Sequence, residues 1–264
     1  DEDMDVIGEL EGIAEDERIY STRFMGKRLY MVTFRQVDPF FVIDLSNPRN
    51  PEIMGELKIP GWSSYLHPYD ENHIIGVGKE TEEDKYGRPR TQGVKVALFD
   101  VSDPENPIEV DKVEIGDSGS DSEVLNDHKA FLFDKEKNLL VIPVREIDGE
   151  RYSYKRVKQG AIVLHIDEDG LRIEKKITHY DGNYQNYWGW YGSPNAVRRA
   201  LYMDDVLYTI SMETIKMHSL DDYDKIGEVD LPYEAPGNNR PVYYDTVDRA
   251  PPEVSKPEIV EWIE

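Results

Sequence analysis

Short apolar runs rich in β-branched and aromatic residues recur along the chain, and they do not show the periodicity of long helices. Examples are residues 29–34, 73–77, 94–99 and 139–144. Asp, Asn, Gly and Pro, which favour turns, separate these runs. Runs of this length and composition are typical of strands, so the pattern predicts an all-β protein.

The predicted strands form a repeated unit of three strands. The middle strand of each unit ends near an Asp or His landmark, and the landmarks Asp44, Asp100, His165 and His218 are 56, 65 and 53 residues apart. Small sheets repeated at a long period are typical of a β-propeller with extended loops, whereas a sandwich has no such period. The sequence therefore predicts about four propeller blades between residues 19 and 231, with very little helix, as part of a larger ring.

Both end segments depart from this repeat. Residues 1–18 are interpreted as an outer strand of a preceding blade, at residues 4–12, followed by a connector; the blades occupy residues 19–233. Residues 234–264 contain five prolines and are predicted to be an extended arm or linker. Because an orphan outer strand needs a hydrogen-bonded neighbour, we expect another segment or a second polypeptide to complete the propeller.

Several segments, in the same order along the chain, resemble one known family. They include YSTRF (20–24), VTFRQVDP (32–39), YLHPY (65–69), LFDVS (98–102) and DHKAF (127–131). They resemble the β-propeller domain of secreted archaeal and bacterial proteins, and the resemblance spans residues 19–231. It implies an extracytoplasmic propeller, extracellular or on the cell surface, and it supplies no catalytic residues to carry over.

The charge balance narrows the possible partners. There are 54 acidic against 31 basic side chains, a net charge of −23. This argues against nucleic-acid binding, which needs a basic face, and against anionic membrane surfaces. No apolar run approaches the ~20 residues of a transmembrane helix. Cysteine is absent, which excludes disulfides and Cys-ligated metals, and a Cys-free chain rich in Glu, Lys and Arg hints at a thermophile.

Polar residues recur just before the strand predicted to be innermost in each repeat. The candidate ligand-binding residues in these segments are Arg23, His67, Tyr69, His128, Lys129 and Arg199. One hypothesis is that they bind an anion or a carboxylate-bearing ligand at the mouth of the central channel. The other is that they form hydrogen bonds to loops of neighbouring blades and hold the ring together.

The segment 183–192 has the most unusual composition in the chain, with aromatic residues among Asn, Gln and Gly. Trp188, Trp190 and Tyr191 are its candidate ligand-binding residues. Rings interleaved with amides suit a glycan or a peptide, and they equally suit a plug packed between blades. If the segment binds a ligand, replacing both tryptophans by alanine weakens binding more than it lowers stability.

Acidic loops are candidates for calcium. The loop 117–121 has two carboxylates and two hydroxyls within five residues, so Asp117 and Asp121 are the candidate metal ligands. The alternative is an ordinary solvated acidic loop, and no loop matches the twelve-residue EF-hand pattern. The six histidines include no closely spaced pair of the kind that marks a zinc site.

Motifs for nucleophilic catalysis are absent from the sequence, which has no Gly-x-Ser-x-Gly segment and no cysteine. The leading prediction is a non-catalytic extracytoplasmic propeller that binds or scaffolds a protein, peptide or glycan. The alternative is a metal-assisted propeller hydrolase with its site at the channel mouth, near His67, His128 and Arg199. The second hypothesis requires these side chains to converge on one cavity.

Overall fold

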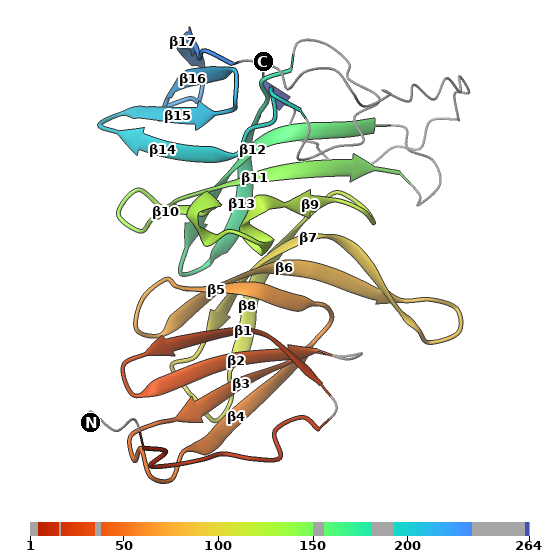
Figure 1. Cartoon of the computed structure of the whole chain (residues 1–264), viewed down its shortest axis with the longest axis vertical. Helices are drawn as coiled ribbons and strands as arrows, with labels where there is room; N and C mark the ends of the chain where they lie inside the picture. Colours follow the sequence, from red (N-terminus) through yellow and green to blue (C-terminus); the bar gives the residue numbers. More distant parts are fainter. Residues whose placement is uncertain are drawn as a thin grey trace.

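Regular structure in the protein is almost entirely β. The computed structural model describes residues 5–15, 17–34, 38–149, 156–180, 193–233 and 262–263. Their strands form four sheets (Figure 1). Two 3-10 helices, η1 (Glu123–Leu125) and η2 (His128–Ala130), interrupt the third sheet. Within the described residues, no helix has the length and apolar character needed to cross a membrane.

Each sheet is an antiparallel meander whose strands follow chain order. The first sheet contains β1 (Arg18–Met25), β2 (Arg28–Phe34), β3 (Asp38–Asp44) and β4 (Glu52–Ile59). The second contains β5 (Trp62–Pro68), β6 (His73–Glu83), β7 (Pro89–Asp100) and β8 (Ile108–Ile115).

The third and fourth sheets follow the same plan. The third contains β10 (Leu132–Asp134), β11 (Leu139–Asp148), β12 (Arg156–Asp167) and β13 (Gly170–Ile177). Two further short strands join it: β9 (Asp121–Ser122) pairs with β11, and β18 (Trp262–Ile263) runs parallel to β13. The fourth contains β14 (Arg199–Met203), β15 (Val206–Ile210), β16 (Thr214–Ser219) and β17 (Lys225–Asp230).

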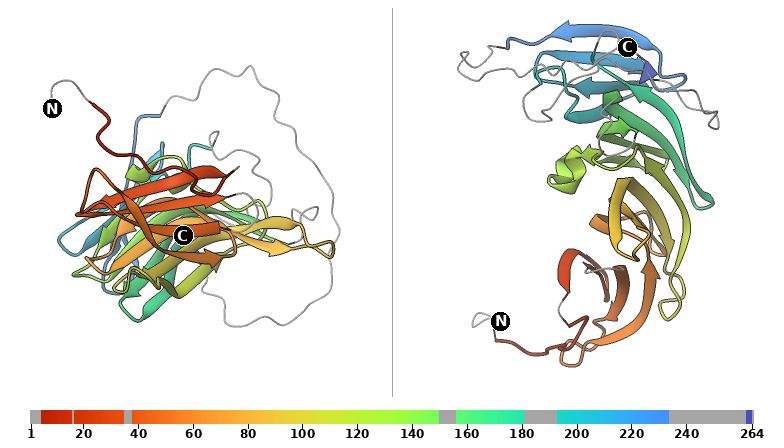
Figure 2. Two further views of the ribbon diagram at one scale, coloured as in Figure 1. Left: turned by 90° about the horizontal axis from the view of Figure 1, so that it is seen from below. Right: turned by 90° about the vertical axis from the view of Figure 1, so that its right-hand side faces the viewer.

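The four sheets are arranged face to face along an arc. The right-hand view of Figure 2 shows the first and fourth sheets at opposite ends, with β4, β8 and β13 on the convex side and η1 and η2 on the concave side. Strand β1 packs against β5, β8 against β13, and β14 against β11 and η2. This arrangement confirms the prediction of about four propeller blades between residues 19 and 231.

Side-chain alternation explains why strands in the second and third sheets have continuous apolar sequences. In β6, Ile74 packs toward the first sheet and its neighbour Ile75 toward the third. In β11, Leu140 packs toward the second sheet and Val141 toward the fourth. Both faces of such a strand are buried, so both must be apolar. A fully buried Val, Ile or Leu side chain contributes about 1.5–3 kcal/mol, and these interfaces hold the arc together.

The predicted turn chemistry is confirmed, with a shift of two landmarks. Asp44 Oδ1 accepts a hydrogen bond from the Ser46 amide, and Asp100 Oδ1 accepts one from the Ser102 amide, both at 2.8 Å. The equivalent acceptors in the third and fourth sheets are Asp167 Oδ1 and Ser219 Oγ, each bound to the amide two residues later. His165 and His218 are therefore not the repeat landmarks, because they lie before the residue that forms the turn.

The predicted three-strand unit lacked the innermost strand of each blade. The three predicted strands correspond to the second, third and fourth strands of each sheet, and β1, β5 and β14 precede them. These inner strands mix polar and apolar residues, since one side borders the concave space, so they gave no long apolar run. Consequently Arg23, His67 and Arg199 lie on the innermost strands themselves, not before them.

The end segments also differ from expectation. Residues 5–12 form no strand, in contrast to the outer strand expected at 4–12. Instead, Leu10, Ile13 and Ala14 pack on the far face of the first sheet, which a preceding blade would otherwise cover. Of the predicted arm, residues 262–263 are described and form β18, whose pairing with β13 extends the third sheet.

Candidate functional site

The inner strand of the third sheet is split. Ser122 of β9 pairs with Val144 of β11, and Leu132 of β10 pairs with Val141 of β11, so β9 and β10 together replace one continuous strand. Residues 123–131 between them leave the sheet as η1 and η2. The Ser122 side chain accepts from the Val124 amide, and the Asp127 side chain accepts from the Lys129 amide at 3.0 Å. These caps fix a projection on the concave side.

Aromatic side chains from β5, from this projection and from β10 form a cluster, which we call the inner cluster: Tyr65, His67, His128, Phe131 and Phe133. The ring centroids of His67 and Phe131 are 4.8 Å apart, and those of Tyr65 and Phe131 are 5.1 Å apart. The exposed ring of His128 stacks on Tyr65 at 6.3 Å with an interplanar angle of 18°. The cluster thus joins the second sheet to the third on the inner side of the arc.

Tyr65 and His67 of the inner cluster are electrically neutral at physiological pH. The Tyr65 hydroxyl and the His67 Nδ1 atom are 2.9 Å apart and share a hydrogen bond. Burial, aided by the nearby positive charge of Arg23, lowers the pKa of His67 to about 4. Burial also raises the pKa of the Tyr65 phenol, so Tyr65 keeps its proton.

Arg23 supplies a positive charge beside the neutral Tyr65 and His67. Its side chain is half-buried on β1 and lies near enough to Tyr65 and His67 to influence both pKa values. Within the described part of the chain, its guanidinium forms no ion pair and no hydrogen bond with another residue. A half-buried guanidinium without a protein partner can form an ion pair with a ligand carboxylate. Because the guanidinium is already partly removed from water, its further desolvation costs little.

Arg199 is placed differently from Arg23. It lies on β14 and forms an ion pair with Asp127, the residue that caps η2. Its partner is 72 residues away in sequence, so the contact fastens the fourth sheet to the projection that carries His128 and Lys129. Lys129 itself is exposed. The structural hypothesis, an inter-blade tie, therefore describes Arg199, while Arg23, His67 and His128 are brought together around Tyr65.

Tyr69 does not share this surface. It is 6% exposed, its ring packs on Phe133 at 5.6 Å, and the Lys135 ammonium lies 4.4 Å from the ring centroid. Lys135 also pairs with Asp70 at 2.7 Å, which helps to lower the pKa of Asp70 to about 2. Tyr69 thus belongs to the packing between the second and third sheets.

The two candidate calcium ligands have protein partners. Asp117 Oδ2 accepts a hydrogen bond from the Gly149 amide at 2.7 Å, and Asp121 Oδ1 forms an ion pair with Lys79 at 3.2 Å. In the described residues, no three His, Asp or Glu side chains gather as a metal site. Calcium binding at Asp117 and Asp121 stays a prediction, and it would have to displace Lys79. The aromatic candidates Trp188, Trp190 and Tyr191 lie outside the described residues.

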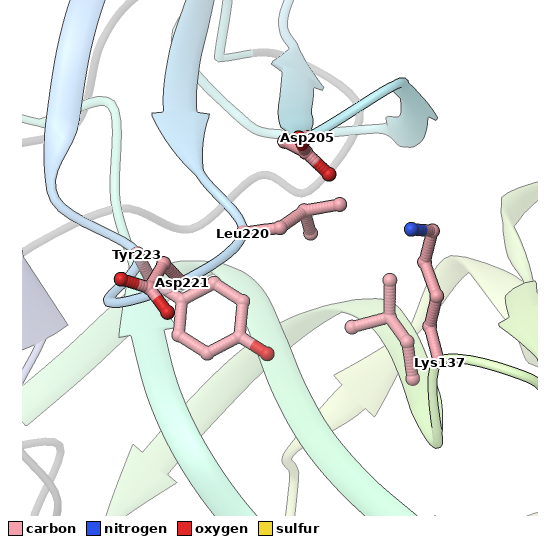
Figure 3. Close-up of a pocket in the computed structure, with 6 residues that line it drawn as sticks. Lys137, Asp205, Leu220, Asp221 and Tyr223 are labelled. Atoms are coloured by element: carbon pink, nitrogen blue, oxygen red, sulfur yellow. The ribbon is translucent and has the colours of Figure 1, made fainter.

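A pocket of about 510 Å³ lies where the third and fourth sheets meet (Figure 3). Its lining comes from three turns and the start of β11, and comprises Lys137, Leu139, Asp205, Leu220, Asp221 and Tyr223. The Tyr223 hydroxyl donates to Glu174 at 3.1 Å, and burial together with the Glu174 charge raises the pKa of Tyr223 to about 12. The pocket therefore offers fixed charges and a protonated phenol.

Sequence reasoning missed Tyr65, Phe131 and Phe133, as well as the pocket. A signal was present for the first three. Tyr65 and His67 alternate along β5, and Phe131 and Phe133 alternate where η2 leads into β10, so each pair lines one face. Nothing in the sequence showed that the two faces meet. The pocket residues belong to separate repeats of the sequence pattern, which gives no reason to place them together.

Comparison with known proteins gives the family. The family model described as "Beta propeller domain" matches residues 1–223. An uncharacterized protein of Archaeoglobus fulgidus is 41% identical over 231 residues, which are 88% of this chain and 30% of that protein. The uncharacterized protein MJ1554 of Methanocaldococcus jannaschii is 36% identical over 222 residues, 84% of this chain and 29% of that protein. The chain thus spans less than a third of the length of these two relatives.

Solved structures show weaker similarity. The computationally designed Ika4 protein is 15% identical with a TM-score of 0.40, and the match covers 81% of this chain and 97% of that protein. The Nup133 β-propeller domain of Vanderwaltozyma polyspora is 10% identical with a TM-score of 0.28, over 81% of this chain and 56% of that domain.

Proposed function

The chain belongs to the β-propeller domain family, and we propose that it is a non-catalytic module that binds a carboxylate-bearing segment of a protein or peptide on the concave side of the arc. The observation that carries this proposal is the Arg23 guanidinium, which has no partner among the described residues and lies beside the neutral Tyr65 and His67. A carboxylate would pair with Arg23, while a neighbouring apolar or aromatic group of the ligand would pack on Tyr65 and His128.

The overall charge supports a localised attraction of this kind. The chain is strongly acidic, with a net charge of −23, so a carboxylate ligand is repelled by most of the surface. Arg23 and the exposed Lys129 lie on the concave side, and they offset that repulsion locally. Binding of an acidic ligand should therefore be specific to this face and weakened by salt.

The metal-assisted hydrolase of the alternative hypothesis has less support. Such a site needs three ligands, whereas His67 is tied to Tyr65 and Arg199 to Asp127. For the whole protein, we extend the proposal to an extracellular or cell-surface location, which the family resemblance of the sequence favours. Protease treatment of intact cells, followed by detection of the full-length protein, tests that part.

A peptide titration tests the binding site. The probes are acetyl-Tyr-Glu and its neutral counterpart acetyl-Tyr-Gln, both as C-terminal amides so that the Glu side chain supplies the only carboxylate, and chitotriose as a glycan. Each is followed by NMR shifts of the 264-residue chain. We expect acetyl-Tyr-Glu to bind most tightly, and Arg23→Ala to weaken it about tenfold, or about 1.4 kcal/mol. His128→Ala should weaken all aromatic probes, whereas Lys58→Ala, which removes an exposed cation on β4, should change nothing.

Three outcomes would contradict the proposal. Equal affinity for the Glu and Gln peptides would show that no carboxylate is recognised. Unchanged binding by Arg23→Ala would place the ligand elsewhere. Tightest binding of chitotriose would indicate a glycan module in place of a peptide module.

A further inference from the structure

The fourth sheet has one buried face and one open face. Leu207, Thr209, Lys216 and His218 are at most 4% exposed and face the third sheet. Side chains alternate along a strand, so the intervening residues point away from the third sheet. The register agrees, because Leu201, Tyr208 and Met217 lie in one row across the strands, and Ile215 lies beside Val229 in the next.

The face of the fourth sheet that points away from the third is apolar at its centre. We call this surface the open face and define it by Leu201, Met203, Tyr208, Ile215, Met217 and Val229. Leu201 is 39% exposed, Met203 55% and Val229 53%, and the other three are half-buried. An antiparallel sheet that ends in water normally presents polar residues on its outer face. A contiguous apolar face of this kind marks an interaction surface.

The faces that the sheets turn toward one another show one way in which a surface of this type is covered. The first and second sheets bury their facing surfaces against each other, as do the second and third, and the third and fourth. In each case a pleated apolar face packs on another pleated apolar face, at the usual spacing of about 10 Å. The open face has the same residue types and the same strand order, so it continues an interface that the arc already uses three times.

Relatives of this chain have polypeptide available for such a covering. The matched regions account for 30% and 29% of the two archaeal relatives, so most of each relative lies outside the match. We propose that the open face packs against a further four-stranded propeller blade supplied by polypeptide outside these 264 residues. This proposal concerns the end of the arc and is independent of the carboxylate site on its concave side.

Cysteine labelling can test the proposal, because these 264 residues contain no cysteine, and any cysteine elsewhere in the complete protein is replaced by serine. Leu201→Cys and Met203→Cys each place one thiol on the open face, and Glu136→Cys places one on an exposed turn as the matched control. Each variant is made in the 264-residue chain and in the complete gene product, which the proposal expects to be a longer chain. Maleimide labelling rates are then compared at several protein concentrations, with sedimentation measured in parallel.

We expect Leu201→Cys and Met203→Cys to react within about threefold of Glu136→Cys in the 264-residue chain. In the longer chain both should react at least about tenfold more slowly, while Glu136→Cys is unchanged. Three results would overturn the proposal. Fast labelling in the longer chain would show that no blade covers the face. Slow labelling in the monomeric 264-residue chain would identify one of its own segments as the cover. Slow labelling that appears together with a dimer would identify a second copy as the occupant.

Discussion

The two ends of the arc are similar four-stranded sheets, but their outward faces differ in how far they are buried. On the first sheet, Met31, Phe41 and Ile43 are at most 5% exposed, because Leu10 and Ile13 of the N-terminal segment pack over them. On the fourth sheet, the corresponding apolar face leaves Leu201 and Met203 open to solvent. A short non-strand segment can therefore cover the outer face of a blade, and a blade can also form with that face open.

The cover on the first sheet is also anchored by a polar contact. The Thr33 hydroxyl donates to a Glu17 carboxylate oxygen at 2.6 Å, which ties the end of the N-terminal segment to β2. At the first sheet, a blade that completed the ring would contact the N-terminal segment. At the fourth sheet, it would contact the strands directly. The two ends are therefore not interchangeable docking surfaces.

The largest expected effect comes from emptying the covered face. Phe41→Ala should lower the free energy of unfolding by about 3–5 kcal/mol, because a buried ring is replaced by a cavity. Phe24→Ala on the same sheet is the matched control. It removes a ring that is 68% exposed, and should change stability by less than about 0.5 kcal/mol. Urea unfolding of the three proteins measures both, and similar losses would show that the first sheet is not covered in solution.

Acid should loosen the fourth sheet before the first. Burial, with Lys216, His218 and Lys225 nearby, lowers the pKa of His179 to about 3, and burial lowers that of His218 to about 4. Unfolding restores values near 6.5, so the unfolded chain binds more protons below that pH. Stability is therefore full above about pH 6.5 and is lost as the pH falls toward 4, by up to about 1.4 kcal/mol per pH unit for each histidine.

The first sheet has no histidine in residues 18–59, so it lacks this source of acid sensitivity. Hydrogen exchange between pH 6.5 and 4.5, corrected for intrinsic rates, should show β14–β17 losing protection before β1–β4. The His218→Gln variant should reduce the difference. Equal loss of protection at both ends of the arc would contradict this account.

Displacing the N-terminal segment should expose the outer face of the first sheet, so that it resembles the open face of the fourth. Ile13→Asp places a charge where a half-buried side chain packs on Met31, Phe41 and Ile43, and should cost about 1–2 kcal/mol. It should also speed hydrogen exchange in β2 and β3 and increase binding of an apolar dye. The control is Ile7→Asp, at a position that is 53% exposed, which should leave all three measurements unchanged.

The smallest effect is expected at the open face. Leu201→Lys combined with Met203→Lys should change the stability of the 264-residue chain by less than about 0.5 kcal/mol, because neither side chain is buried there. Dye binding should fall below that of the natural chain. A loss of several kcal/mol would mean that the face is covered within this chain, which would break the comparison between the ends.

Much of the architecture was predictable because it depends on local patterns. The apolar runs gave three strands of every blade, since those strands are buried on both faces. The Asp-Leu-Ser and Asp-Val-Ser steps gave the turns, because an Asp side chain and a nearby amide are always within reach of each other. The inner strands β1, β5 and β14 escaped detection because they border the concave space and mix polar with apolar residues.

The candidate site was predictable in part. Arg23, His67 and His128 were selected for their chemistry and position in the repeat, and they do gather around Tyr65. The roles of Arg199 and Tyr69 could not be predicted from the sequence. Arg199 pairs with Asp127 and Tyr69 packs on Phe133, and both partners come from distant parts of the chain. Pairing between distant residues has no local signature.

The sequence by itself determined that this protein is all-β, that it is built from about four repeated blades, and where their turns lie. Strand periodicity and turn chemistry act over a few residues, so they are written into the order of the amino acids. Tertiary structure alone decided which apolar faces are covered, which charges have partners, and that β9 and β10 separate to let η1 and η2 project. Those outcomes depend on which surfaces meet in space, and each meeting joins residues that are tens of positions apart.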